Sequence, residues 1–391
     1  MAGPGDDGPE PLRLLSTAGG ASPDGSPVTV APAAYSRSMA SSLVDWNVAL
    51  STATRLVKPG PDISRAGAEE AVAALRASAV RAESYVVEVT GLPVPSATAP
   101  VLVVDRPGWL QANVDGFRQV LAPLEDRAAA KAQAGSPAAL VGSRVTGAEI
   151  GVLLSYLAPK VLGQFDPFFP GAPGAPAGRL LLMAPNIVAV ERELKVDPAD
   201  FRLWVCLHEE THRVQFTAVP WLRDYLNAQI DAIVAATELD GAALWQLLAD
   251  AVRRVSQSVR TGEELSVVDL VQTRAQRETV DRITAVMSLL EGHADVVMDS
   301  VGPAVVPSVA EIRRRFTVRR QGRGFDRVGR KLLGLDAKMR QYRDGARFCR
   351  FVIERIGMTG FNAVWTSPDS LPTREEIAAP ERWLARVPAA A

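Results

Sequence analysis

The chain of 391 residues contains only two cysteines and three histidines, and its formal net charge is −1. Two cysteines are too few for the cysteine-rich ligand sets of most structural zinc sites, and their scarcity fits a reducing compartment. The near-neutral charge provides no general attraction to nucleic acids or acidic membranes. Because no run of 18 or more apolar residues occurs, no transmembrane helix is expected. We therefore expect a cytoplasmic protein with neither nucleic-acid nor membrane partners.

The first 34 residues lack the basic start and the long apolar stretch of a signal peptide. They are rich in glycine, proline, serine and alanine, a composition typical of a disordered tail. An N-terminal, mainly helical region is predicted over residues 35–178, with a short strand at 101–104 and a proline-rich loop at 165–178. A second region, 179–391, is predicted to begin with a strand at 179–183.

All three histidines lie in two short motifs. His208 and His212 belong to the sequence His-Glu-Glu-Thr-His, and His293 belongs to Glu-Gly-His-Ala-Asp. Two imidazoles four residues apart lie on one face of a helix, about 5–6 Å apart at Cβ, so they can bind one metal ion. Glu209 then stands next to that ion and can act on a water molecule bound to it.

The alternative is a surface helix whose histidines and glutamates are merely solvated. The local sequence favours burial instead. Asp197 and Pro198 are typical of a helix start, and the helix that follows is largely apolar. Burying unpaired histidine and glutamate side chains would cost several kcal/mol unless a divalent cation compensates. The apolar positions are Phe201, Trp204, Val205, Leu207, Val214 and Phe216.

The cysteines do not extend this ligand set. Cys206 lies about 200° around the helix from His208, so it points away from the metal face. Cys206 and Cys349 are predicted to be small core residues. A site with three protein ligands and one open position is typical of catalytic zinc, so an open, catalytic Zn²⁺ site is favoured.

The third ligand is expected from the second motif. An apolar stripe with helical period runs through residues 273–300, and Glu291 falls at one margin of it. His293 falls near the opposite margin, about 160° away, so one ion cannot easily bind both. We predict Glu291 as the third ligand and Asp295 as a carboxylate that orients a ligand histidine. His293 stays open as the alternative ligand.

The pattern of His-Glu-x-x-His followed by Glu-x-x-x-Asp resembles the gluzincin group of zinc peptidases. The resemblance implies zinc ligands at His208, His212 and Glu291, a general base at Glu209 and a supporting carboxylate at Asp295. The 78 residues between His212 and Glu291 exceed the gap in thermolysin-like members, so that subfamily is not implied.

A longer match, from Val44 to Thr373, resembles a family of zincin-like proteins found mainly in actinobacteria. Its members are labelled as candidate zinc-dependent metallopeptidases or hydrolases, and some as associated with biosynthesis of the deazaflavin coenzyme. The resemblance implies an α+β, mostly helical zincin-like fold with a small sheet next to the histidine-bearing helix, but no settled substrate. It is carried by Trp204–Phe216, Pro185–Ile187, Val219–Leu222, Leu290–Asp295 and Gly334–Tyr342.

These features predict a zinc-dependent metallohydrolase, foremost a peptidase acting on a peptide or protein substrate. Two alternatives stay open: a catalytically silent scaffold that binds metal and a protein partner, and a hydrolase of small, non-peptide amides. Zincins often bind substrate backbone along a strand near the site, and Leu180–Met183 is the candidate for that strand. The oligomeric state is not indicated.

Two further features carry weaker hypotheses. Residues 313–331 are crowded with arginine, which is typical of a solvated loop, with a lid or a dock for an anionic partner as the alternative. Tyr342 is interpreted as a buried structural residue, and stabilisation of an oxyanion is its alternative role.

Overall fold

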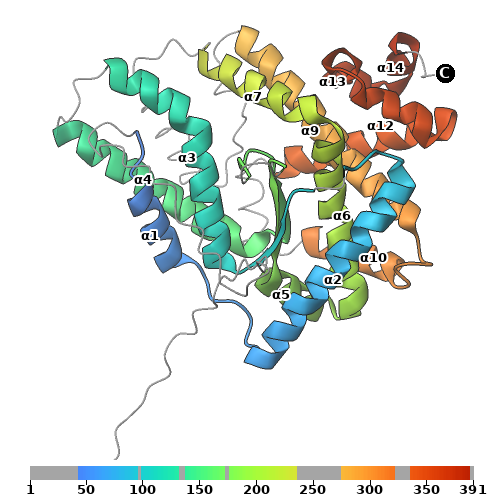
Figure 1. Ribbon diagram of the computed structural model, residues 1–391, viewed down its shortest axis with the longest axis horizontal. Helices are drawn as coiled ribbons and strands as arrows, with labels where there is room; N and C mark the ends of the chain where they lie inside the picture. The colour runs from blue at the N-terminus through green and yellow to red at the C-terminus, as the bar shows by residue number, and fades with distance from the viewer. Residues whose placement is uncertain are drawn as a thin grey trace, which may run out of the picture. The chain divides into compact units, whose positions relative to one another are not determined.

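The computed structural model describes residues 43–95, 98–131, 137–171, 176–235, 274–321 and 335–387. The tail predicted over residues 1–34 lies outside these ranges. The described part is mostly helical, and none of its helices is long and apolar enough to cross a membrane. Figure 1 shows the helices: α1 Trp46–Leu56, α2 Arg65–Thr90, α3 Arg106–Lys131, α4 Pro137–Leu157, α5 Ala184–Leu194, α6 Pro198–Ala218, α7 Pro220–Ala235, α9 Arg274–Val301, α10 Val309–Gln321, α12 Leu335–Phe361, α13 Arg374–Ala378 and α14 Pro380–Arg386.

The described residues form one small sheet with the strand order β1-β3-β2. β1 (Val101–Val104) runs parallel to the central strand β3 (Arg179–Met183), and β2 (Gly163–Asp166) runs antiparallel to it. The strands predicted at 101–104 and 179–183 are thus confirmed, whereas β2 extends into residues predicted as a loop. Strands from both sides of residue 178 share this sheet, so the two predicted regions meet there.

The central strand separates two apolar cores. Successive side chains of a strand point to opposite faces, and all of β3 is buried. Leu180 and Leu182 pack into the larger core, which contains much of α2, α6, α9 and α12. Leu181 and Met183 pack into a second core with residues of α1, α3 and α4. β3 is therefore a continuous apolar run rather than an alternating one, as expected for a strand buried on both faces.

The pairing of β3 corrects one prediction. Leu180–Met183 was the candidate strand for binding substrate backbone, but both of its edges are already paired, with β1 and with β2. Among the described residues, β2 is an edge strand instead, and it lies against α6. The ring of Phe165 on β2 stacks on Phe216 of α6, with 5.4 Å between centroids.

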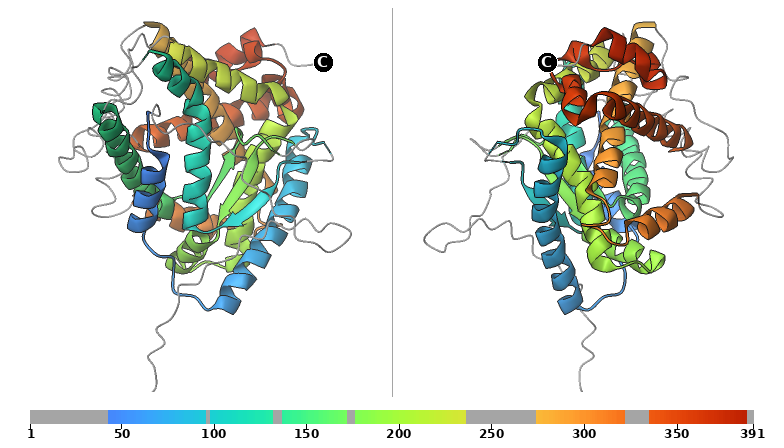
Figure 2. Two further views of the ribbon diagram at one scale, coloured as in Figure 1. Left: turned by 60° about the vertical axis from the view of Figure 1, so that its left-hand side comes forward. Right: turned by 90° about the vertical axis from the view of Figure 1, so that its right-hand side faces the viewer.

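Helix α6 begins as the sequence predicts. The side chain of Asp197 caps it by accepting a hydrogen bond from the backbone N–H of Asp200 at 2.9 Å, and Pro198 occupies the first position. The helix packs against α2 and α9, and it is buried over most of its length. Figure 2 shows α2 running alongside it. The predicted burial of the histidine-bearing helix is confirmed.

Helix α9 is held against α12 by two glycines. A Cβ added to Gly292 would overlap the backbone of Gly345 and Ala346, and one added to Gly345 would overlap the backbone of Ser288. The two helix backbones therefore touch at this crossing. Because Gly292 lies between Glu291 and His293, the contact fixes the rotation of α9 and with it the direction of both side chains.

Candidate metal centre

Three side chains from two helices converge at one point. The Nε2 atoms of His208 and His212 on α6 lie 3.3 Å apart. The Oε2 atom of Glu291 on α9 lies 3.5 Å from Nε2 of His208 and 3.9 Å from Nε2 of His212. Each of the three residues is partly buried. The structure therefore brings together the three residues that the sequence suggested as ligands.

The geometry of this cluster fits a small divalent cation. A tetrahedral zinc ion holds its nitrogen and oxygen ligands at about 2.0–2.2 Å, which separates them from one another by roughly 3.3–3.6 Å. The three measured separations lie at or slightly above that range. Two imidazoles and one carboxylate are also a donor set of catalytic zinc sites, which leave a position for water.

His293, the alternative ligand, lies elsewhere. It is fully buried, its ring stacks on Phe361 with 5.2 Å between centroids, and Trp365 packs beside it. Its Nδ1 atom lies 3.0 Å from Nε2 of Gln215 rather than in the ligand cluster. Burial lowers the pKa of His293 to about 3, so the ring is neutral. It is a neutral histidine of the core, and one of its two ring nitrogens has a hydrogen-bond partner.

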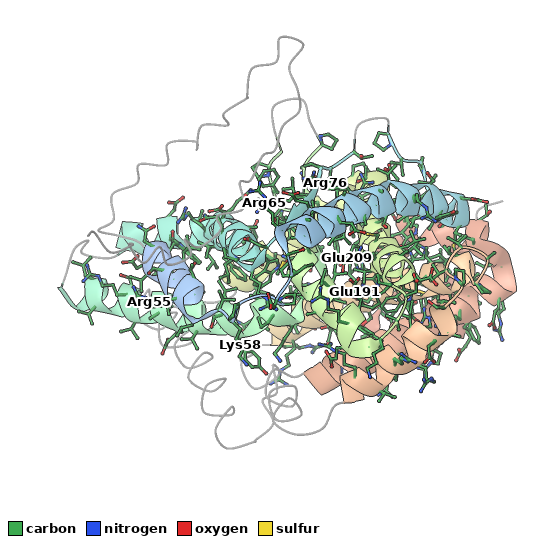
Figure 3. The ribbon with its side chains drawn as sticks, turned by 90° about the horizontal axis from the view of Figure 1, so that it is seen from below. Arg55, Lys58, Arg65, Arg76, Glu191 and Glu209 are labelled. Atoms are coloured by element: carbon green, nitrogen blue, oxygen red, sulfur yellow. The ribbon has the colours of Figure 1, made fainter. Side chains whose placement is uncertain are left out.

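Glu209 stands beside the cluster, on the side of the sheet. The residue is 7% exposed, and Figure 3 labels it among the packed elements of the structure. A Cβ added to Gly163 of β2 would lie 2.6 Å from its Cδ atom, so the carboxylate packs directly on the edge strand. Burial raises the pKa of Glu209 to about 7; His208 opposes the shift, and the negative charges of Glu291 and Glu210 add to it.

Asp295 does not take the place expected for it. Its carboxylate pairs with Arg313 of α10 at 3.0 Å and with Arg350 of α12 at 2.6 Å. Both arginines also pair with Asp299, one turn further along α9. The expected contact with a ligand histidine is replaced by this ion-pair network, because Asp295 faces α10 and α12 rather than α6.

The contact expected from Asp295 is supplied by a residue that the sequence reasoning missed. Gln215, three residues after His212 on α6, places its Oε1 atom 3.0 Å from Nδ1 of His212. Residues three apart share a helix face, so this spacing was the available signal. Glutamine is not one of the usual zinc ligands, so the metal-binding motif itself gives no indication of this role.

A buried charge cluster on the opposite side of α6 was also missed. Arg213 pairs with Glu210 at 2.5 Å and with Glu83 of α2 at 2.8 Å. Burial raises the pKa of Glu210 to about 7, although the neighbouring Arg213 opposes the shift. This cluster joins α2 to α6 behind the metal-binding face and so supports the helix that carries two of the three ligands.

The arginine-rich segment is only partly described, up to Gln321. That part is the helix α10 rather than a loop, and its arginines form ion pairs: Arg314 with Glu311, and Arg319 with Glu193. The remainder of the segment and the side chain of Tyr342 lie outside the described residues.

The sequence profile of a family described as zincin-like metallopeptidase matches residues 44–384. The chain belongs to this family. The predicted zincin-like family and the predicted fold class are thereby confirmed, while the actinobacterial origin and the deazaflavin label stay predictions. Membership indicates a metal-dependent hydrolase. A crystal structure of a candidate hydrolase with a novel fold from Chloroflexus aurantiacus is similar, at 30% identity and a TM-score of 0.64. The match covers 89% of this zincin-like chain and 100% of that one. No curated protein matches the chain.

Proposed function

We propose that this zincin-like protein is a zinc-dependent peptidase in which Glu209 acts as the general base. The observation that carries the proposal is the convergence of His208, His212 and Glu291, with a buried carboxylate beside them. Family membership supports hydrolysis in general. That the bond cleaved is a peptide bond and that the metal is Zn²⁺ are parts of this proposal. A cytoplasmic location stays a prediction.

The three ligands would hold Zn²⁺ through two imidazole nitrogens and one carboxylate oxygen. Zinc, when bound in such a site, lowers the pKa of a water molecule to about 7 and polarises a carbonyl group. The three ligands supply one negative charge against the two positive charges of the cation, so the centre that they form would itself stay positive and would stabilise the negative charge gained by the carbonyl oxygen.

Glu209 is placed to move the proton. Its buried carboxylate lies beside the ligand His208, and the causes of its pKa shift are burial and neighbouring charges. In the proposed reaction Glu209 accepts a proton from that water as the water attacks the carbonyl carbon. It then returns the proton to the leaving nitrogen, whose bond to carbon breaks. A cation bound by the neighbouring ligands would lower the pKa of Glu209 below the value of about 7 that burial gives it in the metal-free site, so the carboxylate would be ionised and able to accept the proton.

The edge strand β2 is the proposed binding element for substrate backbone. Among the described residues its outer edge is not paired with another strand, and Gly163 at its beginning touches Glu209. An extended peptide that paired with this edge would pass close to the proposed base. β2 takes over the role that the sequence analysis assigned to Leu180–Met183.

The proposal is tested with the Glu209→Gln variant. Glutamine keeps the size of the side chain but cannot accept the proton, so hydrolysis of a peptide library should fall at least about 100-fold while the Zn²⁺ content stays stoichiometric. Glu278→Gln, on an exposed pair of α9, is the matched control and should keep full activity.

Other outcomes would change the proposal. If Glu209→Gln kept the wild-type activity, Glu209 would not be the general base. Wild-type protein that binds Zn²⁺ and cleaves small amides but no peptide would be an amidohydrolase. Wild-type protein that binds Zn²⁺ and cleaves neither would be a metal-binding scaffold.

A further inference from the structure

Gln215 is a fully buried amide that contacts both ligand-bearing helices. Its Oε1 atom lies 3.0 Å from Nδ1 of the ligand His212. Its Nε2 atom donates a hydrogen bond to the backbone carbonyl of Leu290 at 3.1 Å, and Leu290 immediately precedes the ligand Glu291. A single side chain thus joins a ligand on α6 to the backbone beside a ligand on α9.

These contacts decide where the protons lie. A backbone carbonyl can only accept, so the NH₂ group of Gln215 must face Leu290 and its oxygen must face His212. Oε1 can in turn only accept, so Nδ1 of His212 carries the proton. In the neutral ring, the form that binds a cation, the proton is then absent from Nε2 of His212, the atom that points at His208 and Glu291.

His293 completes the arrangement behind the glutamine. The second N–H of Gln215 lies 3.0 Å from Nδ1 of His293, so that nitrogen must be the acceptor and its proton sits on Nε2. Nε2 of His293 is buried and has no hydrogen-bond partner within the described part of the chain. His293 therefore restrains Gln215 without itself approaching the cluster.

We propose that Gln215 is a positioning residue for the metal site: it holds His212 in the tautomer whose Nε2 can bind a cation and keeps α6 in register with Glu291. This inference rests on the proposed metal site and adds to it the residue that prepares the site before the cation arrives. Metal-binding histidines generally need such a partner for their second nitrogen, and its loss costs 10–100-fold in metal affinity.

The first test replaces Gln215 with methionine, which has a similar size. Methionine can neither accept a hydrogen bond from His212 nor donate one to the Leu290 carbonyl. Zn²⁺ affinity, measured by competition with a chromophoric chelator, should fall about 10–100-fold in Gln215→Met. Thr217→Val is the matched control, because it removes a side-chain hydrogen bond to the Arg213 carbonyl on the same helix but leaves the ligands alone. Its affinity should match the wild type.

A second readout separates positioning from a merely structural role. With only three histidines in the chain, a long-range ¹H–¹⁵N NMR spectrum of the metal-free, full-length protein resolves each ring. At about pH 8, above the ordinary imidazole pKa, His212 should carry its proton on Nδ1 in the wild type. In Gln215→Met it should populate both tautomers, a change that a loss of packing alone would not cause.

If the methionine variant does not fold, Gln215→Glu provides the test instead. The carboxylate can still accept a hydrogen bond from Nδ1 of His212. Because Nε2 of His293 has no hydrogen-bond partner among the described residues, that ring can move its proton to Nδ1 and donate a hydrogen bond to the carboxylate as well. His212 should therefore keep its wild-type tautomer, His293 should switch, and Zn²⁺ affinity should exceed that of Gln215→Met where both fold.

The outcomes are distinct from those that test the proposed function. Wild-type protein that binds no stoichiometric Zn²⁺ would overturn the metal site and this inference together. Wild-type protein that binds Zn²⁺, with unchanged affinity and an unchanged His212 tautomer in Gln215→Met, would overturn the role of Gln215 alone. Loss of the wild-type His212 tautomer in a folded Gln215→Glu variant would also count against it.

Discussion

Gly163 shows how a residue without a side chain shapes the site. It lies at the start of β2, and a Cβ there would come within 2.6 Å of both Cγ and Cδ of Glu209. These atoms belong to the middle of a buried side chain, so Glu209 as a whole would have to move. The proposed base is therefore positioned by the absence of atoms at residue 163.

We predict that Gly163→Ala lowers kcat/KM for a cleaved peptide by roughly 10–100-fold, because a displacement of about 1 Å in a reacting group can cost that much. Zn²⁺ content should not change, since the ligands lie on α6 and α9. Gly142→Ala is the control, because a Cβ there meets no atom within 4 Å. Equal kcat/KM in both variants and the wild type would show that Glu209 tolerates the displacement or is not the base.

Helix α9 is positioned as an element by interactions at several points along its length. The glycine crossing with α12 fixes its rotation near Glu291. One turn further on, Asp295 and Asp299 bind Arg313 and Arg350 from two neighbouring helices. The network anchors the helix that carries the third ligand, whereas the orienting hydrogen bond comes from α6 itself, through Gln215.

This division of roles predicts the behaviour of Asp295→Asn. The carboxylate is 37% exposed, so losing its charge should cost only about 1 kcal/mol in the free energy of unfolding. Zn²⁺ affinity should stay within about threefold of the wild type, in contrast to the 10–100-fold loss expected for a residue that orients a ligand. Urea unfolding and chelator competition measure the two quantities.

Asp281→Asn is the matched control on the same helix, because Asp281 also pairs with an arginine, Arg374, at 2.7 Å and lies away from the ligands. A loss of zinc affinity confined to Asp295→Asn would restore the orienting role that the gluzincin resemblance implies for Asp295.

At the scale of the whole molecule, the metal site joins two long helices of one core. α6 and α9 both contribute to the larger apolar cluster, and the three ligand atoms lie between them. A cation that binds only the folded arrangement stabilises it by mass action, by about 4 kcal/mol when its free concentration is 1,000 times its Kd. Unfolding must separate the two helices and release the ion.

Removal of the metal by a chelator should therefore lower the Tm of the wild-type protein by on the order of 5–10 °C in differential scanning calorimetry. His208→Ala, which removes one ligand at a partly exposed position, should unfold at the same temperature with and without chelator. If the chelator did not change the Tm of the wild-type protein, no tightly bound cation would bridge α6 and α9.

Local patterns were enough to predict several elements. The N-cap and proline at Asp197 and Pro198 marked the start of α6, and the apolar runs at 101–104 and 179–183 marked two strands. β2 was not predicted, because Gly163, Gln164 and Asp166 are poor strand formers. Its formation depends on pairing with β3 and on the packing of Phe165 against Phe216. The pairing of both β3 edges was equally invisible, because strand order is not a local property.

The sequence by itself determined the donor types and the helix face that presents them, because the spacing of His208 and His212 and the period of α9 are properties of a single helix. Only the tertiary structure decided which carboxylate serves which purpose. Glu291 faces α6, Asp295 faces two arginines, and Gln215 takes the place expected of Asp295, because the glycine crossing with α12 sets the rotation of α9. That rotation depends on contacts between residues more than fifty positions apart, which no local pattern records.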